Sequence, residues 1–194
     1  MHFDYFVKIL PVLATIIAAL IAAALSFVSL TLSKEQKTSE FRQKWIDGLR
    51  EDLSVFLSSA RAFARAVESE RMGADSSFSG QKIADFRHKA TETFYKIKLR
   101  LNPQEIAHEQ LLMLLSEINE KQNRFLNEGE ASPQPVLSAI DVAADHSIYV
   151  LKAEWRRVKE GELPFRIVRN WVAPLIVILS LGFVFVIFFV RPNG

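Results

Sequence analysis

The sequence contains no cysteine, few glycines and no long alternation of apolar and polar residues, and each absence excludes a class of protein. Without cysteine there is no disulfide framework, thiolate zinc site, iron–sulfur cluster or cysteine nucleophile. The seven glycines form neither a GxGxxG sequence nor a Walker loop, which excludes nucleotide binding through those loops. Because sustained period-two alternation is missing, we expect no sheet. The net charge of +2, from 24 basic and 22 acidic residues, is too balanced to indicate direct nucleic-acid binding.

Charge is also missing from two long stretches of the chain. Residues 9–33 and residues 171–190 contain no Asp, Glu, Lys or Arg, and the 137 residues of 34–170 hold 43 of the 46 charged residues. An α-helix rises about 1.5 Å per residue and a bilayer core is roughly 30 Å thick, so about 20 apolar residues cross it. The distribution predicts two transmembrane helices, 9–33 and 171–190.

A cleavable signal peptide is the alternative for the first stretch. Its apolar run is longer than the roughly 7–15 residues of a signal-peptide core, and only Lys8 supplies positive charge before it. Both observations favour a membrane span.

The basic residues beside the two spans predict their orientation. Within 20 residues of the span ends, the central segment has eleven Lys and Arg, whereas the outer sides have only Lys8 and Arg191. Since cytoplasmic flanks are enriched in Lys and Arg, residues 34–170 should be cytoplasmic. We therefore expect a two-pass inner-membrane protein with short external termini, 1–8 and 191–194.

Helical periodicity runs through the central segment. Apolar residues recur in steps of three and four over 35–72, over a second stretch that ends at Asn102, over a third that follows Pro103, and over 136–159. Asn102 is expected to cap the third helix, with Pro103 at its first position. The pattern predicts an all-α membrane protein in which two transmembrane helices flank a cytoplasmic antiparallel four-helix bundle.

Few side chains of the sequence indicate a catalytic or metal-binding role. His108-Glu109 begins like the zinc motif HExxH, but Leu112 stands where the second histidine is needed, so we interpret His108 as part of a solvated helix face. Asp141 and Asp145 lie one turn apart beside His146, and such pairs usually face water or a basic neighbour. We expect no catalytic residue, no metal, no cofactor and no enzymatic activity.

The second and third helices of the central segment have opposite charge. The second has six basic and two acidic residues, and the third, counted from Glu105 to Glu128, has five acidic and two basic residues. One interpretation is a basic surface for nucleic acid or lipid headgroups. We favour the other, in which the two neighbouring helices pair their opposite charges.

Small and hydroxyl side chains follow one face of the first span. They recur in steps of three and four, and small residues allow membrane helices to approach closely. The face either packs against the second span, near Ala173, Ser180 and Gly182, or joins copies of the chain around a poorly selective pore. The members of this small-residue stripe are Thr15, Ala18, Ala22, Ser26, Ser29 and Ser33.

One segment carries a resemblance. Residues 39–53, SEFRQKWIDGLREDL, follow directly after the first span and resemble a stretch found in uncharacterised bacterial two-transmembrane-helix proteins. The layout is similar to transmembrane effectors of anti-phage systems, including those encoded beside retrons. The resemblance implies an effector that a cytoplasmic protein or ribonucleoprotein partner keeps silent, and that permeabilises the inner membrane when released.

Two functions are therefore expected from the sequence. The first is a non-enzymatic membrane effector that self-associates through its spans. The alternative is a membrane-anchored scaffold or regulator whose helices recruit a cytoplasmic partner.

Overall fold

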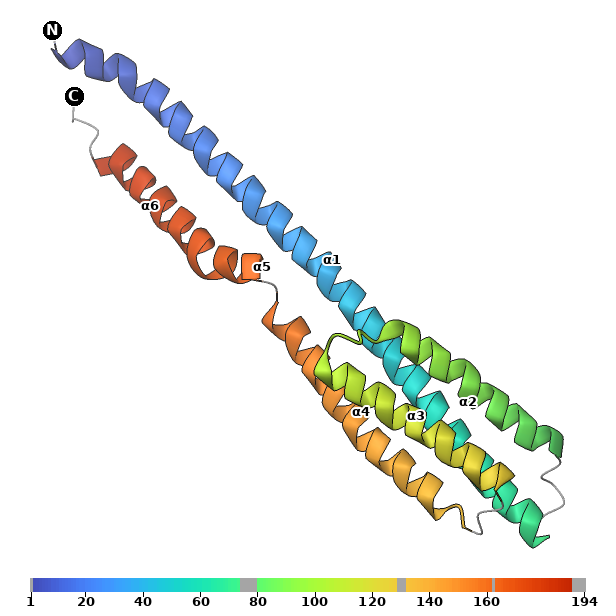
Figure 1. Cartoon of the computed structure of the whole chain (residues 1–194). Helices are drawn as coiled ribbons and strands as arrows, with labels where there is room; N and C mark the ends of the chain where they lie inside the picture. The colour runs from blue at the N-terminus through green and yellow to red at the C-terminus, as the bar shows by residue number, and fades with distance from the viewer. Residues whose placement is uncertain (1, 74–79, 129–131, 162, 190–194) are drawn as a thin grey trace. The chain divides into compact units, whose positions relative to one another are not determined.

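The structure, a computed structural model, describes residues 2–73, 80–128, 132–161 and 163–189 (Figure 1). Within these ranges the chain is almost entirely helical and contains no strand, which confirms the prediction of an all-α protein. The elements are α1 (His2–Met72), α2 (Gly80–Arg100), α3 (Ile106–Asn127), α4 (Gln134–Glu160), α5 (Leu163–Ile167), a π-helical turn η1 (Val168–Val172) and α6 (Ala173–Phe189).

Two helical stretches are long and apolar enough to cross a membrane. One lies at the N-terminal end of α1, and the other covers residues 165–182 from α5 into α6. In their most apolar windows, 0% and 11% of the residues are buried within the chain. These stretches therefore differ from the core helix of a soluble protein, whose apolar residues are mostly covered.

α1 is one helix from the first apolar stretch into the charged segment, and it continues through Gly48. The sequence left open whether a neighbour approaches closely at this glycine or the helix bends there. The structure brings a neighbour close, because a Cβ added to Gly48 would lie 2.7 Å from Nη1 of Arg100 on α2. The missing side chain makes room for the guanidinium group.

The contacts divide the chain into two units. The first unit comprises residues 1–41 and 157–194, and the second unit comprises residues 42–156. The charged domain expected at 34–170 is thus wider than the second unit at both ends.

The core of the second unit takes side chains from α1, α2, α3 and α4. Phe56, Phe63, Leu111, Leu115 and Phe125 are fully buried in it. Its other buried members are Leu49, Leu53, Ala60, Ala64, Ala66, Val67, Ile83, Ala90, Ile97, Leu101, Ile118, Val136, Leu137, Ala139, Ile140, Ala143 and Val150.

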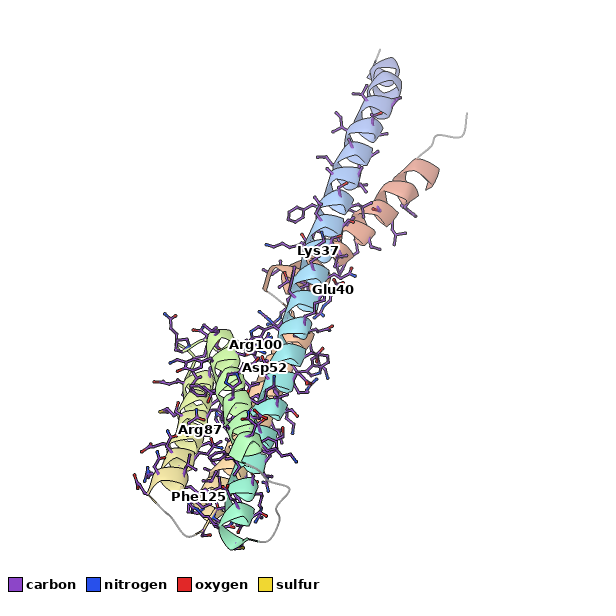
Figure 2. All side chains as sticks on the ribbon, turned by 90° about the vertical axis from the view of Figure 1, so that its right-hand side faces the viewer. Lys37, Glu40, Asp52, Arg87, Arg100 and Phe125 are labelled. Atoms are coloured by element: carbon purple, nitrogen blue, oxygen red, sulfur yellow. The ribbon has the colours of Figure 1, made fainter. Side chains whose placement is uncertain are left out.

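Contacts between the helices of the second unit show how they run. The C-terminal end of α2 meets α1 through Arg100 and Asp52, at the end where the ring of Trp45 also lies 5.9 Å from that of His108 near the start of α3. At the other end, Arg71 of α1 donates a hydrogen bond to the carbonyl oxygen of Phe125 near the end of α3 (Figure 2). α1 and α3 therefore run in one direction, and α2 runs in the other.

α4 buries Leu137 and Ile140 as the apolar spacing predicts, but further along the helix the buried face departs from that spacing. The apolar spacing predicts Ala144, Ile148 and Trp155 on the inner face, but Ile148 and Trp155 are exposed. The residues one position earlier are buried instead: Ala143, Ser147, Val150 and Glu154. Small Ala143 and Ser147 let the neighbouring helices approach, and the Ser147 hydroxyl is satisfied by the carbonyl oxygen of Ala143 at 2.7 Å.

The predicted cap of α3 is also wrong. α3 begins at Ile106, after a turn in which the Asn102 side-chain oxygen accepts a hydrogen bond from the Gln104 N–H at 3.1 Å. Asn102 thus closes a local turn, an alternative open to Asn because its short side chain reaches nearby backbone groups. Pro103 lies in this turn, before the first helical residue.

Candidate functional sites

The small-residue stripe of α1 lies on an exposed face. All six members, Thr15, Ala18, Ala22, Ser26, Ser29 and Ser33, are exposed. The residues of this part of α1 that other residues of the first unit half-bury are different ones: Ala14, Ile21, Ala24, Val28 and Thr31. With 3.6 residues per turn, the centres of the two sets lie about 130° apart around the helix. Within the described ranges, the second span does not cover the stripe.

A buried polar cluster lies where α3 and α4 meet in the second unit. His108 is 4% exposed and Glu154 is 6% exposed, and Nε2 of His108 lies 3.7 Å from Oε1 of Glu154. The interpretation of His108 as a solvated residue is therefore wrong. Both residues continue the three- and four-residue spacing of their buried neighbours, for example Leu111 with His108, and this spacing is the signal that the sequence offered.

The cluster has the donor types of a metal site, because ligand atoms of Glu105, His108 and Glu154 all lie within 4.8 Å of one another. The tautomer of His108 argues against that use. Nδ1 accepts a hydrogen bond from the Asn102 N–H at 3.2 Å, so the ring proton is on Nε2, the nitrogen nearest Glu154. A metal bound at Nε2 would leave the ring without any proton, whereas metal-bound histidines usually donate through their second nitrogen. The arrangement suits a buried histidine beside a carboxylate, with the two groups 3.7 Å apart.

Residues 39–53, the segment that carries the resemblance, form a polar contact with α2. Nε of Arg100 donates to Oδ2 of Asp52 at 2.7 Å, and the guanidinium group lies over Gly48 (Figure 2). Trp45, from the same segment, lies half-buried beside His108. Within the second unit, this segment therefore joins α1 to α2 and α3.

The acidic pair on α4 is explained by its neighbours. Asp141 forms an ion pair with Arg61 of α1, as expected for a carboxylate with a basic neighbour. Nε2 of His146 lies 3.0 Å from the carbonyl oxygen of Ala107. Neither contact places a further metal-ligating group beside Asp145.

The predicted pairing of charge between α2 and α3 is wrong. Over the described residues, Glu92, Glu117 and Glu120 each bind a basic group of their own helix, and no ion pair joins α2 to α3. Lys96 and Lys89 bind Glu92, and the hydrogen bonds and charges of these two lysines lower the pKa of Glu92 from 4.5 to about 2. On α3, Lys121 binds Glu117 at 3.3 Å and Arg124 binds Glu120 at 2.7 Å.

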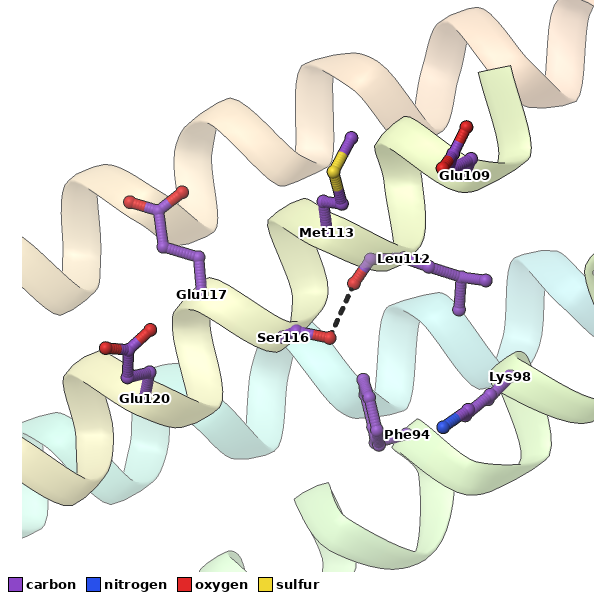
Figure 3. A pocket seen from close by; sticks show the side chains of 8 residues that line it. All are labelled: Phe94, Lys98, Glu109, Leu112, Met113, Ser116, Glu117 and Glu120. Carbon is purple, nitrogen blue, oxygen red and sulfur yellow. Dashed lines mark hydrogen bonds between the residues drawn. The ribbon is translucent and has the colours of Figure 1, made fainter. Parts of the chain in front are cut away.

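A surface groove of about 380 Å³ runs between α2 and α3 (Figure 3). Apolar side chains, one hydroxyl group, one lysine of α2 and three glutamates of α3 line it. We call it the α2–α3 groove. Its lining residues are Phe94, Lys98, Glu109, Leu112, Met113, Ser116, Glu117 and Glu120. Sequence analysis missed this groove, although Glu109, Met113, Glu117 and Glu120 follow the spacing of one helix face.

Comparisons with protein-family models, with curated proteins and with solved structures find no match to this chain. Any function of the chain therefore has to be argued from the geometry of its own residues.

Proposed function

We propose that the protein is a non-enzymatic effector of a bacterial inner membrane, and that copies of it assemble through the small-residue stripe of α1 and permeabilise the membrane. In this proposal α1 and the α5–α6 region cross the bilayer, and the second unit is a cytoplasmic antiparallel four-helix bundle. The resemblance of residues 39–53 adds the setting, which is abortive-infection defence against phage.

The single observation that carries the proposal is the exposure of all six stripe residues, on a face about 130° around α1 from its half-buried side. Lipid tails give no hydrophobic drive for helix association, so small side chains that allow close backbone contact are the usual association surface. A face already covered within one chain would be unable to take that role. Thr15, Ser26, Ser29 and Ser33 would line the contact with hydroxyl groups, which suits a wet and poorly selective path.

The surroundings of the two apolar stretches support the membrane part of the proposal. Val12, Leu20, Leu30, Leu175 and Leu181 each expose more than half of their surface. A continuous apolar surface of this kind is rare on soluble monomers and suits lipid.

The experiment is induced expression in bacteria that carry a membrane-potential dye. We expect depolarisation and growth arrest with the natural chain, and loss of both with Ala22→Leu or Ser26→Leu, because a bulky side chain separates the helices. Ala23→Leu is the matched control: it adds the same atoms at an exposed position, one residue and about 100° around the helix from Ala22. The proposal is wrong if the natural chain leaves the potential unchanged when it reaches the membrane, and a scaffold that only anchors would then explain the spans.

Topology has its own test, because the chain lacks cysteine. Ser132 is exposed in the second unit, and Ser132→Cys provides a single thiol there. We expect a membrane-impermeant maleimide to label this thiol only after the inner membrane is opened. Labelling in cells with an intact inner membrane would place the second unit outside and contradict the proposal.

A further inference from the structure

The α2–α3 groove combines an apolar floor with charges that its own chain leaves uncompensated. Phe94 and Leu112 are half-buried in it, and Met113 is 57% exposed. Lys98 on α2 and Glu109 on α3 both line the groove, yet neither has an ion-pair partner among the described residues. Over the part of the chain that the structure describes, Lys98 of α2 and Glu109 of α3 thus line the groove without an ion-pair partner; Figure 3 shows both side chains.

The faces of α2 and α3 beside the groove extend this pattern. On α3, Ile106, Glu109 and Met113 follow one another in steps of three and four, and Ile106 is 73% exposed. On α2, Tyr95 is 56% exposed and lies next to Phe94 in sequence. A partner for this surface needs apolar side chains together with an acidic group opposite Lys98 and a basic group opposite Glu109.

A second copy of the same surface meets that requirement. If two copies face each other about a two-fold axis parallel to the helices, α2 of each copy lies against α3 of the other at the same height. Lys98 and Glu109 line the same groove, so they lie at nearly the same level, and each meets its opposite charge across the interface. Such an axis keeps the corresponding helices of the two copies pointing in the same direction.

We propose that the α2–α3 groove is a self-association surface at which two copies of the chain pair about an axis parallel to α2 and α3. This inference rests on the proposed function, in which copies meet in one membrane, and it assigns the contact made outside the bilayer. Two helices of 21 and 22 residues present a strip roughly 30 Å long and 20 Å wide, or about 600 Å². Stable soluble complexes bury about 800 Å² per partner, so this contact depends on the membrane to concentrate the copies.

Thiol cross-linking in membranes tests the pairing directly, since the chain has no cysteine of its own. Two differently tagged chains are expressed together, one with Lys98→Cys and the other with Glu109→Cys, and a short bis-maleimide is added to membrane vesicles. We expect a cross-linked product that carries both tags. The control pair is Lys98→Cys with Asp145→Cys, because Asp145 is equally exposed but lies on α4. Absence of the first product, or an equal yield from the control pair, would overturn the inference.

Charge exchange supplies a second test, with Thr91→Cys and Ser116→Cys as the cross-linking reporter pair. Lys98→Glu or Glu109→Lys, each made in both chains, should reduce the yield roughly tenfold, because two symmetry-related pairs then become repulsive. The chain with both exchanges should recover the natural yield, which a merely structural role for either residue would not produce. Equal yields from all four chains would overturn the inference.

Depolarisation measured on the same variants separates the two proposals. Loss of cross-linking with retained depolarisation overturns only the groove contact, whereas a natural chain that cross-links but never depolarises the membrane overturns the proposed function.

Discussion

Gly48 and Arg100 form a contact whose energy can be measured, because the glycine lies in the middle of α1 and the guanidinium group occupies the space of its missing side chain. In Gly48→Ala the new Cβ would lie 2.7 Å from Nη1 and 2.9 Å from Cζ of Arg100. Carbon atoms do not approach that closely, so the guanidinium group must move. That movement strains or breaks the 2.7 Å bond from its Nε to Asp52.

Two effects of opposite sign then compete. Replacing a helical glycine by alanine stabilises a helix by about 1 kcal/mol. The side chains of Arg100 and Asp52 are 37% and 13% exposed, and ion pairs at such surfaces contribute about 0.2–1 kcal/mol. We therefore expect Gly48→Ala to change the free energy of unfolding by less than about 0.8 kcal/mol. In a chain that already carries Arg100→Ala, the same substitution should stabilise by the full amount of about 1 kcal/mol.

The assay is thermal unfolding of the full chain in detergent, followed by circular dichroism, for the natural chain, the two single variants and the double variant. For a chain of this size, 1 kcal/mol corresponds to roughly 2–4 °C in Tm. Gly80→Ala is the control, because a Cβ there meets nothing within 4 Å, and its effect should not depend on Arg100. Equal stabilisation by Gly48→Ala with and without Arg100 would refute the reasoning.

Three further results are expected from the second unit. Phe56→Ala should lower the free energy of unfolding by about 3–5 kcal/mol in chemical denaturation, because Phe56 is fully buried and its loss leaves a cavity. Glu154→Leu should destabilise the chain by about 1–3 kcal/mol by removing the carboxylate beside the buried His108 ring, and adding His108→Leu should recover most of that loss. The pKa of Glu92 is lowered to about 2, so its contribution is fully present above pH 4.5 and is lost as the pH falls towards 2. Glu92→Gln should remove that part of the acid dependence, and an NMR titration of the Glu92 carboxyl group with a midpoint near 4.5 would contradict it.

The helices could be predicted from the sequence because their apolar residues recur with the period of an α-helix. The residues over 35–72 place Leu49, Phe56 and Phe63 on one face, and all three are fully buried. The same reasoning held at the start of α4, where Leu137 and Ile140 are buried. It failed further along α4, because the buried face there includes Ser147 and Glu154, whereas Ile148 and Trp155 point outwards. Apolar spacing cannot recognise a face on which small and charged side chains are buried among their hydrogen-bonding partners.

The candidate sites were less predictable than the helices for a related reason. The spacing of the small-residue stripe is visible in the sequence, but its exposure depends on which side of α1 the rest of the first unit covers. His108 and Glu154 are 46 residues apart, and only the packing of α3 against α4 makes them a buried pair. Long-range pairs of this kind carry no local signal.

The net charges of α2 and α3 did not predict which of their charged groups form ion pairs. Three glutamates of α2 and α3 are neutralised one turn away, as in Lys96 with Glu92, because a helix brings residues three or four apart together without any help from folding. This local pairing leaves Lys98 and Glu109 as unmatched charges on opposite walls of the groove. In a dissolved monomer, water would solvate them and their arrangement would be unimportant. Between copies that share a membrane, even a contact worth a few-fold in affinity becomes populated, because confinement supplies the concentration that the small interface lacks.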